Sequence, residues 1–221
     1  MKPRLVIVGS EGHASVVIDI VERQGAYKIA GLIDSYKPQG TRVLGYEVLG
    51  EEQQFPAIMQ MLTIDAVIVA IGDNWQRERM VALLISSVPD VSFATAIHPS
   101  ACVARTVQLG SGTVVMPGSV VNANCRIGHH CILNTNSSLD HDSVMEDYSS
   151  LGPNAATGGN VSIGLSTAIG LGASIIHNIR IGSHTVVGAG ATVVTSLPER
   201  TVVFGTPAKV ARTRQIGEQY L

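Results

Sequence analysis

A histidine flanked by two aspartates, His141 between Asp140 and Asp142, is the residue group best suited to acid–base chemistry in this sequence. A neighbouring carboxylate fixes the tautomer of an imidazole and raises its basicity, which makes this histidine a candidate general base. Gly159 and His177 follow His141 at intervals of eighteen residues, so in a coil of that length the three share one turn column. Gly159 would then leave open space beside His141, a slot for a thin ligand. A solvated turn histidine between two turn aspartates explains the same residues equally well.

The remaining histidines are weaker candidates for chemistry. His129 and His130 lie in an ordinary turn after a glycine, His184 lies in a similar turn, and His98 precedes a proline. A metal held between subunits by His129 or His130, His177 and a histidine of a neighbouring chain is an alternative, but no acidic partners for it stand out. We therefore expect no metal site.

A six-residue repeat between residues 97 and 197 predicts the elements that position these residues. In steps of six from Ile97, sixteen of seventeen positions are aliphatic and Thr157 is the exception, and a mostly small residue follows four positions after each. A period of six fits neither an α-helix nor a simple strand and is typical of a β-helix, in which each unit forms a short strand and a turn. Glycine directly follows the aliphatic residue in seven units, and these glycines are expected in turns at positive φ.

The first 96 residues alternate between strand-like and helix-like segments, which predicts a small parallel sheet covered by helices. The expected strands are residues 4–8, 29–33, 42–48 and 66–71, and the expected helices are residues 14–23, 51–62 and 76–86. We therefore expect two domains, residues 1–96 and 97–221. The polar tail, residues 210–221, is compatible with a helix.

Three loops are expected at one edge of the N-terminal sheet. Gly9-x-x-Gly12 follows the first strand, and glycine there lets backbone N–H groups approach a phosphate at a helix N-terminus. Asp34 ends the second strand, where a ribose-binding acid often lies, although a turn or helix-cap aspartate is the alternative. Gly72-Asp73-Asn74 ends what is expected to be the central strand. Together the loops favour a nucleotide-like ligand over a dinucleotide cofactor, whose glycine fingerprint is incomplete here.

Charge and apolar patterning exclude several classes of protein. The net charge is −2 and no basic block occurs, so nothing favours nucleic acid or an anionic membrane as a partner. No apolar span approaches membrane length and the N-terminal apolar run is too short for a signal peptide, which predicts a cytoplasmic protein. Two of the three cysteines, Cys125 and Cys131 but not Cys102, occupy small inward positions, which favours reduced core residues over disulfides.

The whole chain resembles the sugar acetyltransferases of the left-handed β-helix superfamily. It resembles in particular the nucleotide-sugar N-acetyltransferases with a small Rossmann-like N-terminal domain, such as those of bacillosamine and GDP-perosamine, and the sialic acid O-acetyltransferases share this layout. The motifs that carry the resemblance are Gly9-Ser-Glu-Gly12-His13, Asn134-Thr-Asn-Ser-Ser-Leu-Asp-His141-Asp142 and Gly205-Thr-Pro-Ala-Lys209. The fold that it implies is an α/β Rossmann-like domain followed by a left-handed parallel β-helix.

The resemblance also implies roles for single residues. His141 matches the catalytic histidine that removes a proton from the attacking amine, and Asp142 stands where close relatives have a glutamate. Gly159 matches a glycine whose N–H bonds the thioester oxygen, and Ser150 replaces a histidine of the bacillosamine enzymes. The residues implied to bind the nucleotide sugar are Gly9, Gly12, His13, Asp34, Lys37, Gly72, Asp73 and Asn74. Those implied to lie along acetyl-CoA, in a groove between two prisms, are Gly170, Gly188, Ala189, Pro207 and Lys209.

The activity that the resemblance implies is direct transfer of an acetyl group from acetyl-CoA to an amine, at C4, of a nucleotide-linked amino deoxysugar. The enzyme would be a cytoplasmic homotrimer with active sites between subunits, serving glycan or lipopolysaccharide O-antigen biosynthesis. A sialic acid O-acetyltransferase shares every motif and differs only in acceptor. A metal-dependent or non-catalytic β-helix protein, such as a carbonic anhydrase relative, is the third interpretation.

Overall fold

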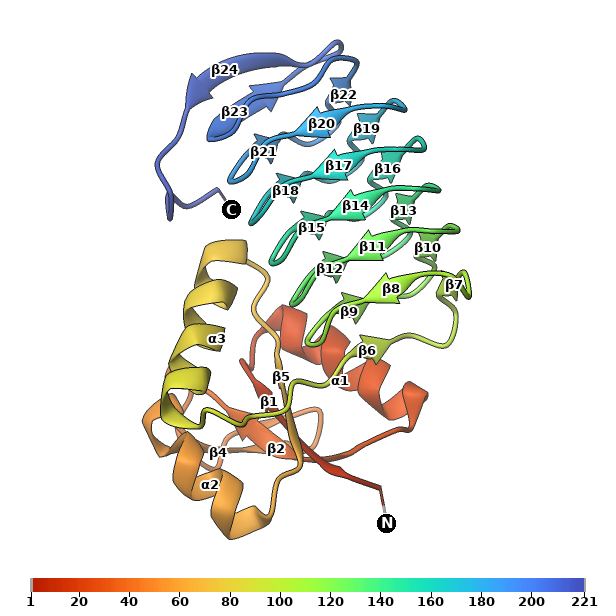
Figure 1. The fold of residues 1–221 in the computed structure, drawn as a ribbon. Helices are drawn as coiled ribbons and strands as arrows, with labels where there is room; N and C mark the ends of the chain where they lie inside the picture. The colour runs from red at the N-terminus through yellow and green to blue at the C-terminus, as the bar shows by residue number, and fades with distance from the viewer. Residues whose placement is uncertain (1, 221) are drawn as a thin grey trace.

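The computed structural model describes residues 2–220, which form a small α/β domain followed by a parallel β-helix (Figure 1). The elements of the α/β domain are β1 (Arg4–Val8), α1 (Gly12–Gln24), β2 (Lys28–Ile33), β3 (Arg42–Val43), β4 (Tyr46–Gly50), η1 (Glu52–Gln54), α2 (Phe55–Leu62), β5 (Ala66–Val69) and α3 (Asn74–Ser87). The strand order in this sheet is β3-β4-β2-β1-β5, and only β3 runs antiparallel, to β4.

The helix expected at residues 51–62 divides into η1 and α2. Two further differences from the predicted N-terminal elements concern strands. The strand expected at residues 42–48 is a hairpin of two strands, because Leu44 and Gly45 adopt positive φ and reverse the chain. The strand expected to be central, β5, lies instead at the end of the sheet, so that prediction was wrong. Within residues 2–220, the backbone of its outer edge pairs only at the isolated bridge between Val67 and Phe93.

The six-residue repeat forms the predicted β-helix. Each unit is a two-residue strand, and every third strand stacks in parallel register on the last, giving three sheets. The first sheet holds β6 (Ala96–Ile97), β9 (Val114–Val115), β12 (Ile132–Leu133), β15 (Ser150–Leu151), β18 (Ala168–Ile169), β21 (Val186–Val187), β23 (Thr201–Phe204) and β24 (Lys209–Thr213). The second holds β7 (Cys102–Val103), β10 (Val120–Val121), β13 (Ser138–Leu139), β16 (Ala156–Thr157), β19 (Ser174–Ile175) and β22 (Thr192–Val193). The third holds β8 (Gln108–Leu109), β11 (Arg126–Ile127), β14 (Val144–Met145), β17 (Ser162–Ile163) and β20 (Arg180–Ile181).

The aliphatic series fills the centre of the prism, as predicted. Val115, Leu133, Leu151 and Ile169, for example, are buried in one core, and small inward residues such as Cys125 share it. Cys125 and Cys131 are buried free thiols and Cys102 is an exposed one, which confirms the expectation of reduced cysteines among the described residues. The architecture is therefore the expected α/β domain followed by a left-handed parallel β-helix.

The explanation offered for the glycines of the repeat was wrong. Positive φ occurs three residues after the aliphatic position, on residues such as Asn124 (63°), Asn136 (56°) and Asp142 (58°), and after glycine, asparagine and aspartate are the residues that tolerate this conformation best. The glycines directly after the aliphatic residue serve close stacking instead. A Cβ on Gly152, for example, would lie 2.9 Å from the carbonyl carbon of Gly170 in the next coil.

Helix α1 lies between the N-terminal sheet and the first coils of the β-helix. Its apolar face packs with Leu5 and Ile7 on one side and with Ala96, Val114 and Ile132, the outward residues of the first prism sheet, on the other. Helices α2 and α3 cover the opposite face of the N-terminal sheet. The expected domain boundary after residue 96 falls inside β6, since Ala96 already pairs with Val114.

The tail is not a helix. Strand β24 runs antiparallel to β23, and residues 214–220 then return toward α3 without helical structure (Figure 1). Residue 221, the last of the predicted segment, lies outside the described residues. A helix would satisfy its backbone N–H and C=O groups with hydrogen bonds inside the segment. Here the pairing of β24 with β23, at Val203–Val210 and Phe204–Lys209, supplies partners for these groups instead.

Candidate active site and substrate crevice

His141 lies on the corner of the prism between β13 and β14 and is exposed to solvent. Its Nδ1 atom lies 2.7 Å from Oδ2 of Asp142. Because a carboxylate oxygen accepts, this contact assigns the proton to Nδ1 and leaves the Nε2 lone pair free. The hydrogen bond with Asp142 raises the pKa of His141, and the charge of Asp140 adds to it. The side chain is therefore arranged as a base.

Asp142, and not Asp140, orients the imidazole. The left-handed backbone of Asp142 (φ 58°) turns its carboxylate back onto the ring of the preceding residue. Asp140 instead accepts the backbone N–H of His141 at 2.8 Å, and its own N–H donates to Oγ1 of Thr157 at 3.1 Å. The one polar residue in the aliphatic series thus supports the turn that carries His141.

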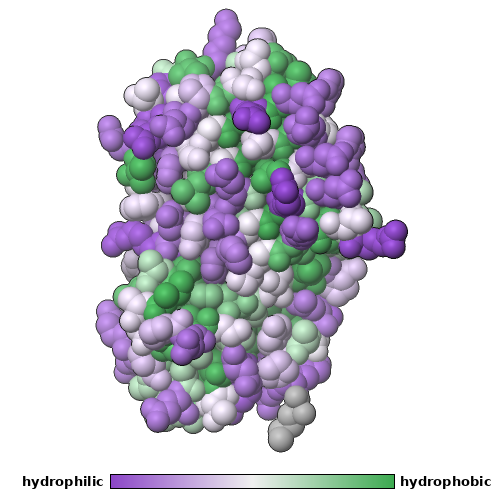
Figure 2. Space-filling view, viewed as in Figure 1, coloured by the Kyte–Doolittle hydropathy of each residue, from purple (hydrophilic) through white to green (hydrophobic). Residues whose placement is uncertain are grey.

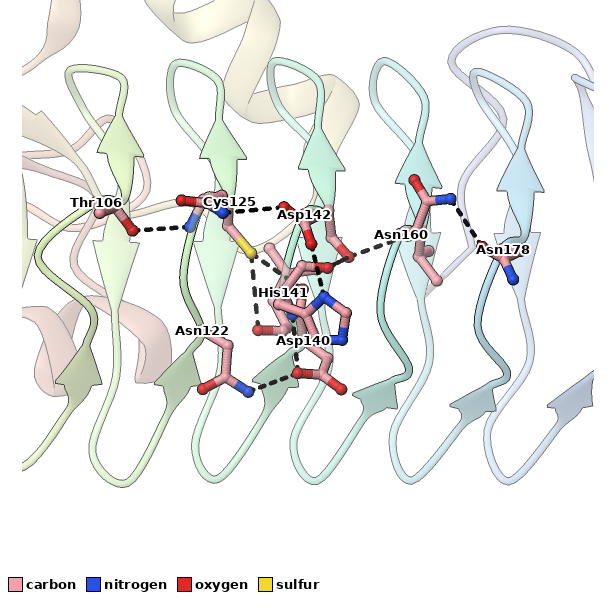
Figure 3. Close-up of polar contacts among 12 residues, drawn as sticks. Thr106, Asn122, Cys125, Asp140, His141, Asp142, Asn160 and Asn178 are labelled. Carbon is pink, nitrogen blue, oxygen red and sulfur yellow. Dashed lines mark hydrogen bonds and ion pairs between the residues drawn. The ribbon is translucent and has the colours of Figure 1, made fainter.

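Two asparagines of the preceding coil hold the two carboxylates (Figure 3). Asn122 donates to Oδ1 of Asp140 at 2.7 Å, and Asn124 donates to Oδ1 of Asp142 at 3.1 Å. These bonds help keep the pKa of each carboxyl below its usual range, after the larger effect of the hydrogen bonds with His141. The sequence analysis missed both asparagines, although each stands eighteen residues before its aspartate, the spacing of one coil.

Gly159 lies one coil above His141, as the repeat predicted. A Cβ on Gly159 would lie 2.6 Å from both Cε1 and Nε2 of the His141 ring. The expectation of an open slot for a ligand there was wrong, because the imidazole itself occupies the space that the missing side chain leaves. The carbonyl of Gly159 accepts from Asn178, whereas within residues 2–220 its N–H has no acceptor. A free N–H therefore lies on the same corner as the free Nε2 atom.

The N-terminal loops form one crevice of about 320 Å³ at the carboxyl ends of the parallel strands. Of the residues implied to bind the nucleotide sugar, the crevice brings together Gly9, Gly12, His13, Asp34, Gly72 and Asp73. A Cβ on Gly12 or Gly72 would meet nothing within 4 Å, so both glycines keep the space open. Burial lowers the pKa of His13 to about 4, with a smaller effect from Arg77, so this imidazole is neutral at physiological pH.

Two of the implied ligands do not line this crevice. Asn74 is buried, and its side chain donates to the carbonyl of Thr167 in the β-helix at 3.2 Å. Lys37 lies in an adjacent hollow, where its Nζ atom donates to the carbonyl of Ser10 at 2.6 Å. Asp34 accepts the N–H of Tyr36 at 2.6 Å, which is the turn role weighed as the alternative, while its buried carboxylate also faces the crevice.

Among the residues of the crevice lining that the sequence analysis did not single out are Glu52 and Tyr36. Glu52 presents a buried carboxylate from the short η1 turn, and Tyr36 stands at the rim with 87% of its surface exposed. Residues 51–62 are expected to form one helix, but they divide into η1 and α2, and this division turns Glu52 into the crevice. Glu52 and Asp34 give the crevice two carboxylates, which suit the hydroxyl and N–H donors of a nucleoside.

A second cavity, of about 680 Å³, runs along the outer face of the first prism sheet. His13 and Gly72 line both this groove and the crevice, so the two are continuous. The groove wall is mostly aliphatic, and its polar groups include Ser150, Asn134 and Tyr220. Of the residues implied to lie along acetyl-CoA, Gly170, Gly188 and Ala189 line it. Pro207 and Lys209 are exposed on the β23–β24 hairpin, outside the groove.

His141 lies away from both cavities. Each coil visits the first, second and third sheets in turn, so the corner between the second and third sheets is opposite the first sheet. His141 stands on that corner, whereas α1 and the groove lie against the first sheet. The body of the prism thus separates His141 from the crevice of its own chain.

Neither a membrane span nor a metal cluster is found in residues 2–220: no helix there is long and apolar enough to cross a bilayer, and no three His, Cys, Asp or Glu side chains gather as metal ligands would. Hydrophilic residues cover much of the surface in the view of Figure 2, with hydrophobic patches between them.

Comparison with known proteins identifies relatives that share this architecture. Residues 4–84 match the family described as PglD N-terminal domain. A UDP-N-acetylbacillosamine N-acetyltransferase of Bacillus subtilis (strain 168) is 34% identical over 114 residues, which is 51% of this chain and half the length of that relative. PerB from Caulobacter crescentus, solved with CoA and GDP-perosamine, is 37% identical over 94% of this chain and 97% of its own, with a TM-score of 0.88. Variants of that N-acetyltransferase with a histidine replaced by alanine or asparagine have also been solved. The acetyltransferase domain of PglB from Neisseria gonorrhoeae FA1090, solved with acetyl coenzyme A, is 30% identical over 95% of this chain and 100% of its own, with a TM-score of 0.88.

Proposed function

The chain belongs to the left-handed β-helix sugar N-acetyltransferases with a PglD-type N-terminal domain, and on this basis we propose that it transfers the acetyl group of acetyl-CoA to the C4 amine of a nucleotide-linked amino deoxysugar. The observation that carries the proposal is the His141–Asp142 pair, which leaves a basic nitrogen with a free lone pair on the same corner of the prism as the N–H of Gly159. The relatives solved with CoA and with GDP-perosamine support the choice of both substrates.

The proposed chemistry is direct transfer between two bound substrates. The amine nitrogen attacks the thioester carbonyl while Nε2 of His141 accepts a proton from the amine. The C–S bond then breaks, and the protonated His141 returns the proton to the leaving sulfur, which releases CoA as the thiol. Asp142 holds the ring and stabilises its protonated form. The N–H of Gly159 donates to the oxyanion of the tetrahedral intermediate. A positioned base contributes about 10²–10⁴-fold to such a rate.

The crevice and the groove are proposed to hold the two substrates. A diphosphate suits the Gly9–Gly12 loop at the N-terminus of α1, and the carboxylates of Asp34 and Glu52 suit the ribose and the base. The aliphatic groove suits the pantetheine arm of CoA, and its junction with the crevice at His13 and Gly72 is where sugar and thioester would meet.

We further propose that each active site is shared between two chains of a homotrimer. The separation of His141 from its own crevice supports this, because a histidine on the opposite corner of the prism serves a crevice only if that crevice belongs to a neighbour. The solvent exposure of His141 in the single chain is in keeping with a site that a second chain completes.

A complementation experiment tests the shared site. Gly12→Phe places a ring in the crevice at a position where a Cβ meets nothing within 4 Å, and His141→Asn removes the base. Each variant alone should be inactive. Mixed trimers from equal amounts should regain about a quarter of wild-type activity, because that share of sites pairs an intact crevice with an intact neighbouring histidine. Mixed trimers as inactive as their parents would refute sharing.

Thiol release from acetyl-CoA against a panel of acceptors tests the activity itself. The panel holds a UDP-4-amino sugar, a GDP-4-amino sugar, sialic acid and CMP-sialic acid, with His141→Asn as the control. Turnover of one amino sugar that the variant loses would establish class, acceptor and base together. Turnover of a sialic acid alone would change the assignment to O-acetylation. Full turnover by the variant would remove His141 from the mechanism.

A further inference from the structure

We propose that Tyr220, in the tail that follows β24, is a positioning residue for the loop Gly72-Asp73, which lines the crevice proposed to hold the acceptor, and that it acts through the N-terminus of α3. The inference rests on the proposed function and concerns the C-terminal tail, which is distant in sequence from the residues of the crevice. Tyr220 lines the groove, while the loop it contacts lines the crevice.

The tail is fixed to the β-helix by Arg214. This side chain is buried, and its guanidinium donates to the carbonyl of His184 at 3.1 Å and to that of Glu218. It also lies 5.5 Å from the centre of the Tyr220 ring, a cation–π distance. Arg212 pairs with the carboxylate of Glu218. The tail therefore has a defined path back toward α3.

The Tyr220 hydroxyl completes the cap of α3. The first N–H groups of a helix lack partners within the helix. In α3 the side chain of Asp73 accepts the N–H of Gln76 at 2.9 Å, and the hydroxyl of Tyr220 accepts the N–H of Asn74 at 3.1 Å. Burial raises the pKa of Tyr220, so the hydroxyl stays protonated and neutral. Two segments 146 positions apart thus meet at one backbone group.

Asn74 joins the tail to the rest of the molecule. Its side chain donates to Thr167 of the β-helix and accepts from Arg77 of its own helix, while its N–H belongs to Tyr220. Next to it, Gly217 packs so closely on the indole of Trp75 that a Cβ would lie 2.7 Å from Nε1. The start of α3 is therefore held by the β-helix through Thr167 and by the tail through Tyr220.

The loop that this arrangement fixes is the one shared by both cavities. Gly72 lies two residues before Asn74 and lines the crevice and the groove, and Asp73 lines the crevice. Loosening the Asn74 N–H would let this loop move at the junction where the sugar must enter the groove. The affinity for the nucleotide sugar should therefore fall, whereas the hydrogen bond between His141 and Asp142, on the far corner of the prism, should not change.

The test compares Tyr220→Phe with Tyr27→Phe, which removes a hydroxyl at the opposite end of the N-terminal domain. Hydrogen exchange of the free protein should speed up about five-fold at the Asn74 amide in Tyr220→Phe and stay unchanged in the control. The KM for the nucleotide sugar should rise about three- to ten-fold, with kcat at saturation and the thermal midpoint near wild type.

The two readouts separate this inference from the function on which it rests. Exchange is measured without substrate, so faster exchange at Asn74 supports positioning by Tyr220 even if every acceptor in the panel fails. Unchanged exchange overturns the inference whatever the activity. Faster exchange with an unchanged KM in an active enzyme overturns the link to acceptor binding.

Discussion

Replacing Arg77 should destabilise the chain more than replacing any exposed residue of the same helix. Arg77 is 1% exposed and donates to the carbonyls of His130, Tyr148, Ile71 and Gly72 at 2.8–2.9 Å, and to Oδ1 of Asn74 at 2.7 Å. Burial lowers its pKa. One guanidinium thus ties α3 to two turns of the β-helix and to the crevice loop.

The magnitude follows from the groups left behind by Arg77→Met. Within the described residues none of the four carbonyls accepts another hydrogen bond, so all four lose their partner. A buried unsatisfied group costs about 1–3 kcal/mol, which sums to roughly 4–12 kcal/mol. Relief from burying a charge and entry of water offset part of it. We expect a net loss of about 3–5 kcal/mol, comparable to breaking a buried ion pair.

Arg79→Met is the matched control, because Arg79 is exposed on the same helix and loses the same charge. Urea unfolding at a fixed protein concentration, followed by circular dichroism, measures both variants. The control should lie within about 0.5 kcal/mol of wild type. Equal stability of the two variants would refute the claim that Arg77 ties the domains together.

Three further predictions follow from the site and its surroundings. Asp142→Asn should move the rise of kcat/KM with pH to lower pH and reduce the plateau, because the carboxylate that raises the pKa of His141 is gone; an unmoved rise in the pH–rate profile would contradict this. Gly159→Ala should cut kcat about 10²-fold with little change in unfolding temperature, because its Cβ would lie 2.6 Å from Nε2 of His141 and turn the ring; wild-type turnover would contradict it. Burial, and to a smaller extent the charge of Arg77, lower the pKa of His130 from 6.5 in the unfolded chain to about 4. Between pH 4 and pH 6.5 the unfolded chain therefore binds a proton at this imidazole that the folded chain does not bind. Stability should fall as pH drops from 6.5 toward 4, by about 3 kcal/mol from this group, and His130→Asn should flatten that dependence in urea titrations at several pH values.

The repeat predicted the β-helix almost residue by residue, because a period of six assigns every residue a coil and a corner. It placed Gly159 beside His141, and the structure has them in contact. The same arithmetic applied to Asn122 and Asn124 would have found the partners of the two aspartates. What it could not give is the direction of a side chain within its turn, which decides that Asp142, and not Asp140, meets the imidazole.

Contacts that join distant segments were out of reach of the sequence. Arg77 sits in an ordinary helical pattern, and its partners are backbone carbonyls, which leave no mark on residue type. The polar sequence of the tail is compatible with a helix. Its antiparallel pairing with β23 and the hydrogen bond between Tyr220 and Asn74 depend instead on where the last coil ends. Glu52 was concealed by a short η1 turn that precedes α2.

The separation of His141 from its own crevice, in contrast, follows from residues visible in the sequence. The outward positions of the first prism sheet are apolar in its first coils, at Ala96, Val114 and Ile132, whereas the third sheet presents Gln108 and Arg126 at the same positions. Covering an apolar outer face stabilises it, and within residues 2–220 the N-terminal domain is the body that covers this one. Once that domain is assigned to the first sheet, the corner that bears the histidine lies opposite it. Outward-facing residues of a β-helix thus predict where a flanking domain docks, and from that which catalytic groups one chain cannot bring together.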